Sequence, residues 1–209
     1  MCVEYDCQAT WKNLYKEDLG IATIQDRFST GNTDVVFEFD DTLLTDEVIP
    51  TSITLRQYVT DHFDHVTVAG GTEICKLYLV SVFDIAEIDP YVWGLTIGGA
   101  NGIGPNAGSF ILFGYMYNEL TFTVNSENDT LEFCTGDYDD IIPMSYWVAN
   151  HELGHQRAGL QEDNSAASDC IMKSTIPTYI VSGHTKLKRF SSHRVFCTNC
   201  CTNISNQNW

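Results

Sequence analysis

The sequence predicts an α/β fold in which a mixed β-sheet supports a long helix, followed by a smaller, irregular C-terminal lobe. Two observations predict this class: strand and helix patterns alternate through the first half of the chain, and a helical segment near residue 150 carries a His-x-x-x-His pair. A chain of 209 residues is long enough for one sizeable core. We therefore expect one domain over residues 1–209, with an upper lobe of about residues 1–158 and a lower lobe of about residues 159–209.

The first half of the chain predicts a strand, a helix and a second strand. Asp34–Asp40 is rich in β-branched and aromatic residues, which is typical of a strand. Thr51 or Ser52 can cap the helix that follows. Its expected apolar face comprises Ile53, Tyr58 or Val59, and Phe63. Ile74–Ile85 is the most apolar strand pattern, so we expect it to lie centrally, paired in parallel with the first strand, and Cys75 to be a small buried hydrophobe.

Three shorter segments complete the predicted upper lobe. Cys2–Cys7 is expected to be a local loop, open to a disulfide between its two ends. Trp11–Leu19 predicts a short helix that ends at Gly20. Leu120–Phe133 alternates polar and apolar residues around a polar turn, which predicts a hairpin.

A glycine-rich run separates two further strand patterns, Trp93–Ile97 and Ser109–Tyr115. Gly102 and Gly104 lack the third glycine, the Lys-Ser/Thr pair and the helix of a phosphate-binding loop, so nucleotide binding is excluded. The run is either a surface loop or the rim of a cleft. We expect Ser109–Tyr115 to be an edge strand, to which an extended peptide could add as a further strand.

Composition excludes several classes of partner. There are 28 acidic against 11 basic side chains, a formal charge of −17, and phosphate recognition needs clusters of Lys and Arg, so we expect neither nucleic acid nor an anionic membrane as partner. We expect no membrane insertion, because no apolar run reaches spanning length. Eight cysteines favour a trimmed extracytoplasmic or secreted domain, with a cytoplasmic protein as the alternative.

The segment Trp147–His155 contains His-Glu-x-x-His, which on a helix forms a metal site. His151 and His155 are four residues apart, so their rings lie on one side about 6 Å apart along the axis and can share one cation. Neutral imidazoles suit zinc, which in catalytic sites takes three protein ligands and a water. Glu152 lies about 100° further round, where it can act as general base toward that water.

Asp137, Asp139 and Asp140 precede Pro143 and predict the start of this helix. Calcium binding by the acidic run is the alternative, which we do not favour because the spacing of a known calcium loop is missing. Two structural alternatives also remain open for the motif itself. Five-residue matches occur by chance, and His151 and His155 could be core or surface residues of a disulfide-rich structural domain.

From Asn150 onward the chain resembles the metzincins, zinc metallopeptidases with a His-Glu-x-x-His helix, a glycine bend, a third ligand and a methionine turn. The resemblance implies a zincin fold. The family's third histidine is missing: the bend, Gly159, comes one position late, and the third-ligand place falls on Glu162 counted from the bend or on Gln161 counted from His151. Glu162 is therefore the expected third ligand, with Asp163 second and His184 a further candidate.

Downstream segments extend the resemblance. Cys170-Ile171-Met172 resembles the methionine turn, with Met172 beneath the histidines, and Lys188–Arg194 resembles the C-terminal helix. Cys170 with Cys197-x-x-Cys200 is similar to the archaemetzincin branch, in which four cysteines hold a second, structural zinc. One of those four cysteines is absent here. Either these cysteines, with His193, hold a structural zinc, or Cys170 forms a disulfide with Cys197 or Cys200, which we favour.

The resemblance implies hydrolysis of peptide bonds in peptide or protein substrates. Zn²⁺ on His151, His155 and Glu162 would activate a water, with Glu152 as general base. The alternative is a peptidase-like binding module that holds a peptide without cutting it, because the third histidine is absent.

Overall fold

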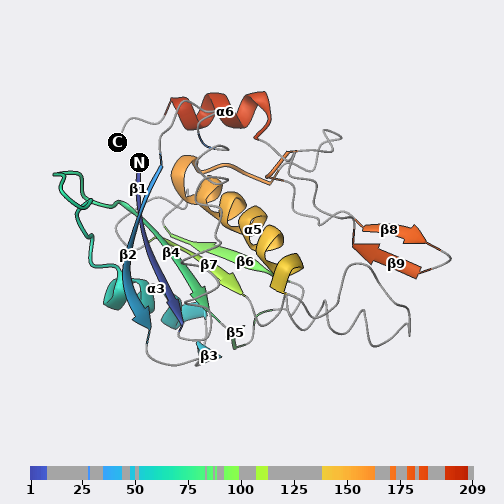
Figure 1. Cartoon of the computed structure of the whole chain (residues 1–209), viewed down its shortest axis with the longest axis horizontal. Coiled ribbons are helices and arrows are strands. Elements are labelled where there is room, and N and C mark those ends of the chain that lie inside the picture. Colours follow the sequence, from blue (N-terminus) through green and yellow to red (C-terminus); the bar gives the residue numbers. More distant parts are fainter. Residues whose placement is uncertain are drawn as a thin grey trace.

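The computed structural model describes residues 1–8, 28, 35–43, 48–49, 52–82, 84–86, 88, 92–98, 107–112, 138–162, 170–172, 178–181, 184–187 and 196–206. Within these ranges the chain forms a five-stranded mixed sheet and three helices, so the predicted α/β class and mixed sheet are confirmed. Figure 1 shows the long helix α5 lying across the sheet, with α6 near one end of it.

The sheet has the strand order β2-β1-β4-β7-β6. Its members are β1 (Cys2–Gln8), β2 (Val36–Leu43), β4 (Leu77–Val82), β6 (Gly94–Ile97) and β7 (Gly108–Leu112). Strands β2, β1, β4 and β7 are parallel, and β6 pairs with β7 in the antiparallel direction. The strand predicted over Ile74–Ile85 is confirmed as the central strand β4, fully buried along its length.

The prediction for the N-terminus was wrong, because Cys2–Cys7 belongs to the buried strand β1. This strand lies between β2 and β4, so the two predicted strands run parallel but do not pair directly. Its side chains alternate between the two faces of the sheet, with Val3 and Tyr5 on one and Glu4 and Asp6 on the other. Three polar or charged residues, Glu4, Asp6 and Gln8, conceal the strand character of this short segment, although all its side chains are buried.

Buried carboxylates of β1 have specific hydrogen-bond partners. The Glu4 carboxylate accepts hydrogen bonds from the backbone N–H groups of Asp64 (2.7 Å) and Val66 (2.8 Å), which ties down the segment before β4. The Tyr78 hydroxyl donates to Asp6 at 2.7 Å. Burying a charge requires such compensation, so these bonds explain how an acidic strand can occupy the middle of the sheet.

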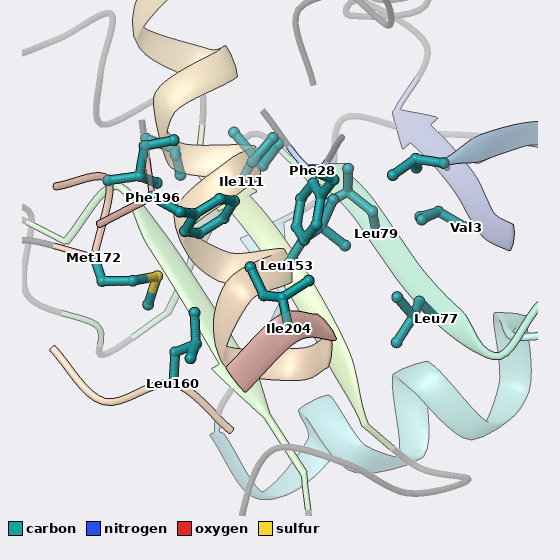
Figure 2. Close-up of a cluster of buried hydrophobic side chains, with 14 of the residues drawn as sticks. Val3, Phe28, Leu77, Leu79, Ile111, Leu153, Leu160, Met172, Phe196 and Ile204 are labelled. Atoms are coloured by element: carbon teal, nitrogen blue, oxygen red, sulfur yellow. The ribbon is translucent and has the colours of Figure 1, made fainter. Parts of the chain in front are cut away.

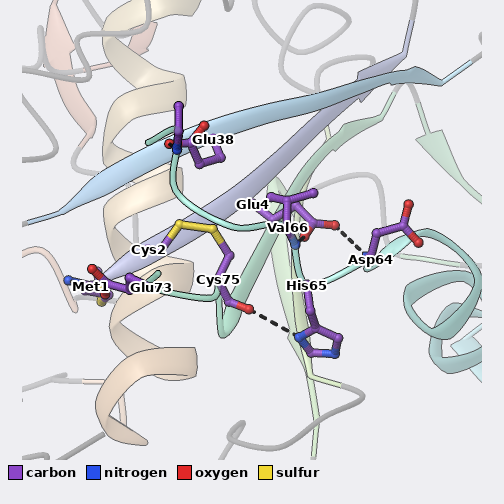
Figure 3. The surroundings of a disulfide bond; sticks show 10 residues. Met1, Cys2, Glu4, Glu38, Asp64, His65, Val66, Glu73 and Cys75 are labelled. Atoms are coloured by element: carbon purple, nitrogen blue, oxygen red, sulfur yellow. Dashed lines mark hydrogen bonds and ion pairs between the residues drawn. A yellow bond between two sulfur atoms is a disulfide. The ribbon is translucent and has the colours of Figure 1, made fainter. Parts of the chain in front are cut away.

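A disulfide joins β1 to the same segment (Figure 3). It links Cys2 to Cys75, so Cys75 is buried as expected but is not a simple hydrophobe, and the disulfide left open between Cys2 and Cys7 does not form. The partner of Cys2 follows from the placement of β1 beside β4, which the cysteine spacing does not encode.

Helix α3 (Ser52–His62) covers one face of the sheet. The predicted helix is confirmed, and its buried side chains Leu55 and Val59, with Phe63 just beyond its end, pack on Tyr78 and Phe110. On the opposite face, α5 (Tyr138–Ala158) and α6 (Thr198–Ser205) contribute to the second core cluster.

That second cluster joins α5 to segments that follow it in the chain, including α6 (Figure 2). Leu153 of α5 packs among Leu79 and Ile111 of the sheet, together with Met172 and Phe196 from beyond the helix. The helix begins at Tyr138, five residues before Pro143, so Asp139 and Asp140 lie inside its first turn. Burying one apolar face over strands β4, β7 and β6 fixes the position of the predicted metal motif.

The edge of the sheet beside α5 is β6, and the prediction that Ser109–Tyr115 forms an edge strand was wrong. Strand β7 lies between β4 and β6 and is fully buried, whereas β6 is half-buried. The strand predicted over Trp93–Ile97 is confirmed as β6. Among the described strands, β6 is the last of the sheet on this side, and it contacts α5.

The remaining described elements are small. Strands β3 (Val48–Ile49) and β5 (Asp84–Ile85) pair in parallel, and β8 (Thr178–Val181) and β9 (His184–Leu187) pair antiparallel. The predicted helices over residues 11–19 and 188–194 and the hairpin over 120–133 lie outside the described residues. Among the described helices, none has the length and apolar character needed to cross a bilayer.

Candidate metal centre

Helix α5 ends at the candidate site, and its termination folds the chain back toward the two histidines. The helix stops at Ala158, and Gly159 takes a left-handed conformation with φ 58°. The Gly159 N–H donates to the carbonyl of His155 at 2.9 Å, a helix-ending turn that favours glycine. The turn returns Glu162, so that one ligand atom each from His151, His155 and Glu162 lies within 4.8 Å of the others.

Backbone carbonyls fix the tautomer of both histidines. The Nδ1 atom of His151 lies 2.9 Å from the carbonyl oxygen of Ile171, and Nδ1 of His155 contacts the carbonyl of Leu160. A carbonyl oxygen only accepts hydrogen bonds, so both Nδ1 atoms carry the proton. The two Nε2 atoms then face each other at 3.0 Å with their lone pairs.

Two facing lone pairs at this distance repel unless a positive charge lies between them. Burial lowers the pKa of His151 to about 4, so protonation of this imidazole does not supply that charge at neutral pH. A tetrahedral zinc with ligand nitrogens at about 2.05 Å separates them by roughly 3.3 Å, close to the distance found here. Carbonyl acceptors on the far nitrogens are typical of metal-binding histidines. The donor set therefore fits a divalent cation.

The candidates for third ligand differ in placement. Glu162 is exposed at the mouth of the site and belongs to the ligand group, while Gln161 also lines the pocket. Asp163 lies outside the described residues. His184 begins strand β9, where its backbone pairs with Val181 of β8. Among the described residues, Glu162 is thus the carboxylate that the bend brings to the two histidines.

Glu152 lies in the same pocket, a cleft of about 280 Å³ between the end of α5 and the edge strand β6. Its wall is formed by Gly94, Leu95, Thr96, His151, Glu152, His155 and residues 159–162. Burial raises the pKa of the Glu152 carboxyl to about 8, and a hydrogen bond from Thr96 opposes that rise. A bound cation would lower this pKa further, toward the range that suits a general base near pH 7.

Met172 is fully buried in the core cluster that also contains Leu153 and Leu160. Its position depends on Gly154, the glycine inside the motif. A Cβ at Gly154 would lie 2.6 Å from Met172 Sδ and 3.1 Å from the Phe196 ring. The methionine therefore packs directly on bare helix backbone, and the preceding residue, Ile171, is held where its carbonyl meets His151.

Three cysteines converge behind this turn. The Sγ atoms of Cys170 and Cys200 are 3.8 Å apart, and those of Cys197 and Cys200 are 3.4 Å apart. None of the three forms a disulfide, so the favoured disulfide from Cys170 to Cys197 or Cys200 was wrong. A disulfide needs about 2.05 Å, whereas sulfurs at about 2.3 Å from a tetrahedral zinc lie roughly 3.8 Å apart. The three sulfurs form a second candidate metal-binding group, and His193 lies outside the described residues.

The electrostatics of this cluster favour a thiolate at Cys170. Hydrogen bonding from Cys200 lowers the pKa of the Cys170 thiol to about 5, assisted by the backbone N–H of Cys197 at 3.5 Å. The same interaction raises the pKa of Cys200 above its usual value. A thiolate is the form of cysteine that binds metal, and a cation among the sulfurs would favour ionisation of the others too.

Sequence reasoning missed the residues that hold the site from β6 and from the loops. Thr96 Oγ1 lies 2.6 Å from Glu152 Oε2, and the carbonyls of Leu160 and Ile171 hold the histidines. Every residue has a backbone carbonyl, so a sequence does not show which of them will accept a hydrogen bond from a histidine. Gly94 and Thr96 give a weak sequence signal for the site, because they are two positions apart in a predicted strand and so lie on the same face of it.

The pKa of Glu152 predicts a pH-dependent stability for the metal-free protein. The pKa of Glu152 is about 8 in the folded protein, above the ordinary value of 4.5. The contribution of this carboxyl to the free energy of unfolding is therefore most favourable below about pH 4.5 and is lost as pH rises toward 8. Glu152→Gln should therefore gain stability over the parent across this window, by on the order of a few kcal/mol at its upper end. Urea unfolding in chelator at several pH values measures this. A difference that stays flat or narrows with rising pH would contradict the buried-carboxyl account.

No model of a known protein family matches this sequence, and no curated protein matches it either.

Proposed function

We propose that this protein is a zinc-dependent metallopeptidase with a zincin fold. The observation that carries the proposal is the pair of imidazoles, bonded through Nδ1 to backbone carbonyls and facing each other through Nε2 at 3.0 Å, with Glu152 in the same pocket. His151, His155 and Glu162 would hold the ion. When bound, zinc supplies Lewis acidity, which polarises a carbonyl and acidifies a water.

The residues of the chain would supply the remaining chemistry. Glu152 is placed in the pocket wall beside the histidines, where it can take a proton from the attacking water and deliver it to the leaving amine. The two backbone carbonyls keep both imidazoles in the tautomer that binds metal. Met172 is buried against Gly154 of the motif, where it would help to exclude water from that side of the site.

The position of β6 at the edge of the described sheet supports a peptide or protein as substrate. Gly94, Leu95 and Thr96 of this strand line the pocket, and an edge strand can bind an extended chain through its backbone groups. Such binding would place a peptide bond across the candidate metal site. Together with the glycine bend and the methionine buried against Gly154, this arrangement supports the resemblance to metzincins.

The cysteine cluster supports a second, structural zinc. Cys170, Cys197 and Cys200 would supply three of its ligands, and their spacing suits a tetrahedral thiolate site. A peptidase-like binding module is the second candidate function. The exposure of Glu162 favours it, because an exposed carboxylate in place of a third histidine gives a looser metal site.

Metal content separates these functions. Elemental analysis of the purified protein is expected to give zinc at both groups, and a chelator should abolish peptide cleavage. His155→Ala should lose the ion of the histidine site and all cleavage while keeping the ion at the cysteines. His62→Ala is a matched control, because that ring packs on Tyr58 of α3 away from the site. A parent protein that cannot take up zinc at the histidines would favour the binding module.

A further inference from the structure

Strand β6 contacts Glu152 at two points on the same face. Thr96 Oγ1 lies 2.6 Å from Glu152 Oε2 and 3.0 Å from the Glu152 backbone carbonyl. Two residues earlier, a Cβ at Gly94 would lie 2.6 Å from Glu152 Oε1 and 2.8 Å from its Cγ. Alternate residues of a strand share a face, so Gly94 leaves room for the carboxylate that Thr96 binds.

We propose that Thr96 is a positioning residue for the base, holding Glu152 Oε2 so that Oε1, over Gly94, remains the oxygen that meets the substrate water. The inference deepens the peptidase proposal and rests on it. Three side-chain torsion angles link the Glu152 carboxylate to the backbone, so the carboxylate could otherwise rotate within the pocket. One short hydrogen bond to Thr96 of β6 removes that freedom. The strand that would bind substrate therefore also orients the base.

A buried polar chain orients Thr96 in turn. Ser109 Oγ lies 3.0 Å from Thr96 Oγ1 and 3.3 Å from Gln156 Oε1, and Gln156 Nε2 donates to the carbonyl of Ala107 at 3.0 Å. The bond to Ala107 fixes the Gln156 amide, so its Oε1 faces Ser109. Ser109 and Gln156 are both buried, which makes the chain a fixed support from β7 and α5.

Counting protons shows that Thr96 can bond to Glu152 in either protonation state of the carboxyl. Thr96 and Ser109 have one hydroxyl proton each, and Ser109 donates its proton to Gln156 Oε1. Thr96 therefore either donates to Ser109 and accepts from a protonated Glu152, or donates to an ionised Glu152. Loss of the Thr96 hydroxyl should therefore harm the base more than loss of the Ser109 hydroxyl, which acts one step further away.

The test uses Thr96→Val, which removes the hydroxyl at nearly constant shape, and Thr96→Ser, which keeps it. In the zinc-loaded protein, Thr96→Val should lower kcat for a peptide about 10–100-fold with KM and zinc content unchanged, and Thr96→Ser should restore most of kcat. Ser109→Ala should fall between them. Thr60→Val is a matched control, because Thr60 is exposed on α3 and bonds only within its helix.

A Thr96→Val protein with the parent kcat, or a Thr96→Ser protein as impaired as Thr96→Val, would overturn the proposal. A second readout does not need activity. In chelated protein, the effect of Thr96→Val on the urea midpoint should shrink in a Glu152→Ala background, because the hydrogen bond has lost its acceptor. Additive midpoints would overturn the positioning role. If the parent cleaves no peptide but the cycle shows coupling, the peptidase proposal fails and the contact between Thr96 and Glu152 stands.

Discussion

Glu152→Ala is expected to keep its zinc and lose peptide cleavage by orders of magnitude. The ligand group consists of His151, His155 and Glu162, so removing the Glu152 carboxylate leaves the metal-binding atoms in place. A positioned general base contributes about 10²–10⁴-fold to a rate, and no other carboxylate among the described residues lines the pocket except the proposed ligand Glu162. Elemental analysis and a peptide cleavage assay on the same sample measure both quantities.

Two further variants sharpen this experiment. Glu152→Gln preserves the volume of the side chain and can still bond to Thr96, so cleavage should fall as far as in Glu152→Ala if proton transfer is the function of the residue. Asp61→Ala removes an exposed carboxylate of α3 and should leave cleavage unchanged. If Glu152→Ala cleaves peptides as well as the parent, the general-base mechanism is wrong.

The Cys200→Ser protein is expected to bind one equivalent less of metal. It should also lose a large part of the free energy that stabilises the segments around Cys170 and α6. Structural zinc contributes on the order of 10 kcal/mol of apparent binding free energy in small domains, so losing one thiolate should cost several kcal/mol here. Cys170 precedes Ile171, whose carbonyl fixes His151, so zinc affinity at the histidines should also decrease. Thermal unfolding and metal analysis measure these effects.

The chain offers a closely matched control for this variant. Cys201 is the next residue of α6, yet its thiol donates to the carbonyl of Phe196 and does not belong to the metal-binding group. Cys201→Ser should therefore keep both metals and most of the stability. Equal metal content in the two variants would contradict a structural site at Cys170, Cys197 and Cys200.

The resemblance and the local spacing together anticipated the residues of the histidine site. His151 and His155 share a helical face for a reason that operates within five residues, and Gly159 ends the helix through its own backbone freedom. Glu162 follows so closely that the bend alone returns it to the histidines. Strand β4 was equally predictable, because its residues are apolar or aromatic except for Ser81.

Only the tertiary structure placed β1 between β2 and β4, paired Cys2 with Cys75, and made β6 the edge beside Glu152. The approach of Cys170 to Cys197 and Cys200 was predicted, but the predicted disulfide between them was wrong. The strand order and the Cys2–Cys75 bond join segments far apart in the chain. The face that a helical residue shares depends on residues three or four positions away. Strand order and the partners of a side chain depend instead on contacts that form only when the whole core assembles.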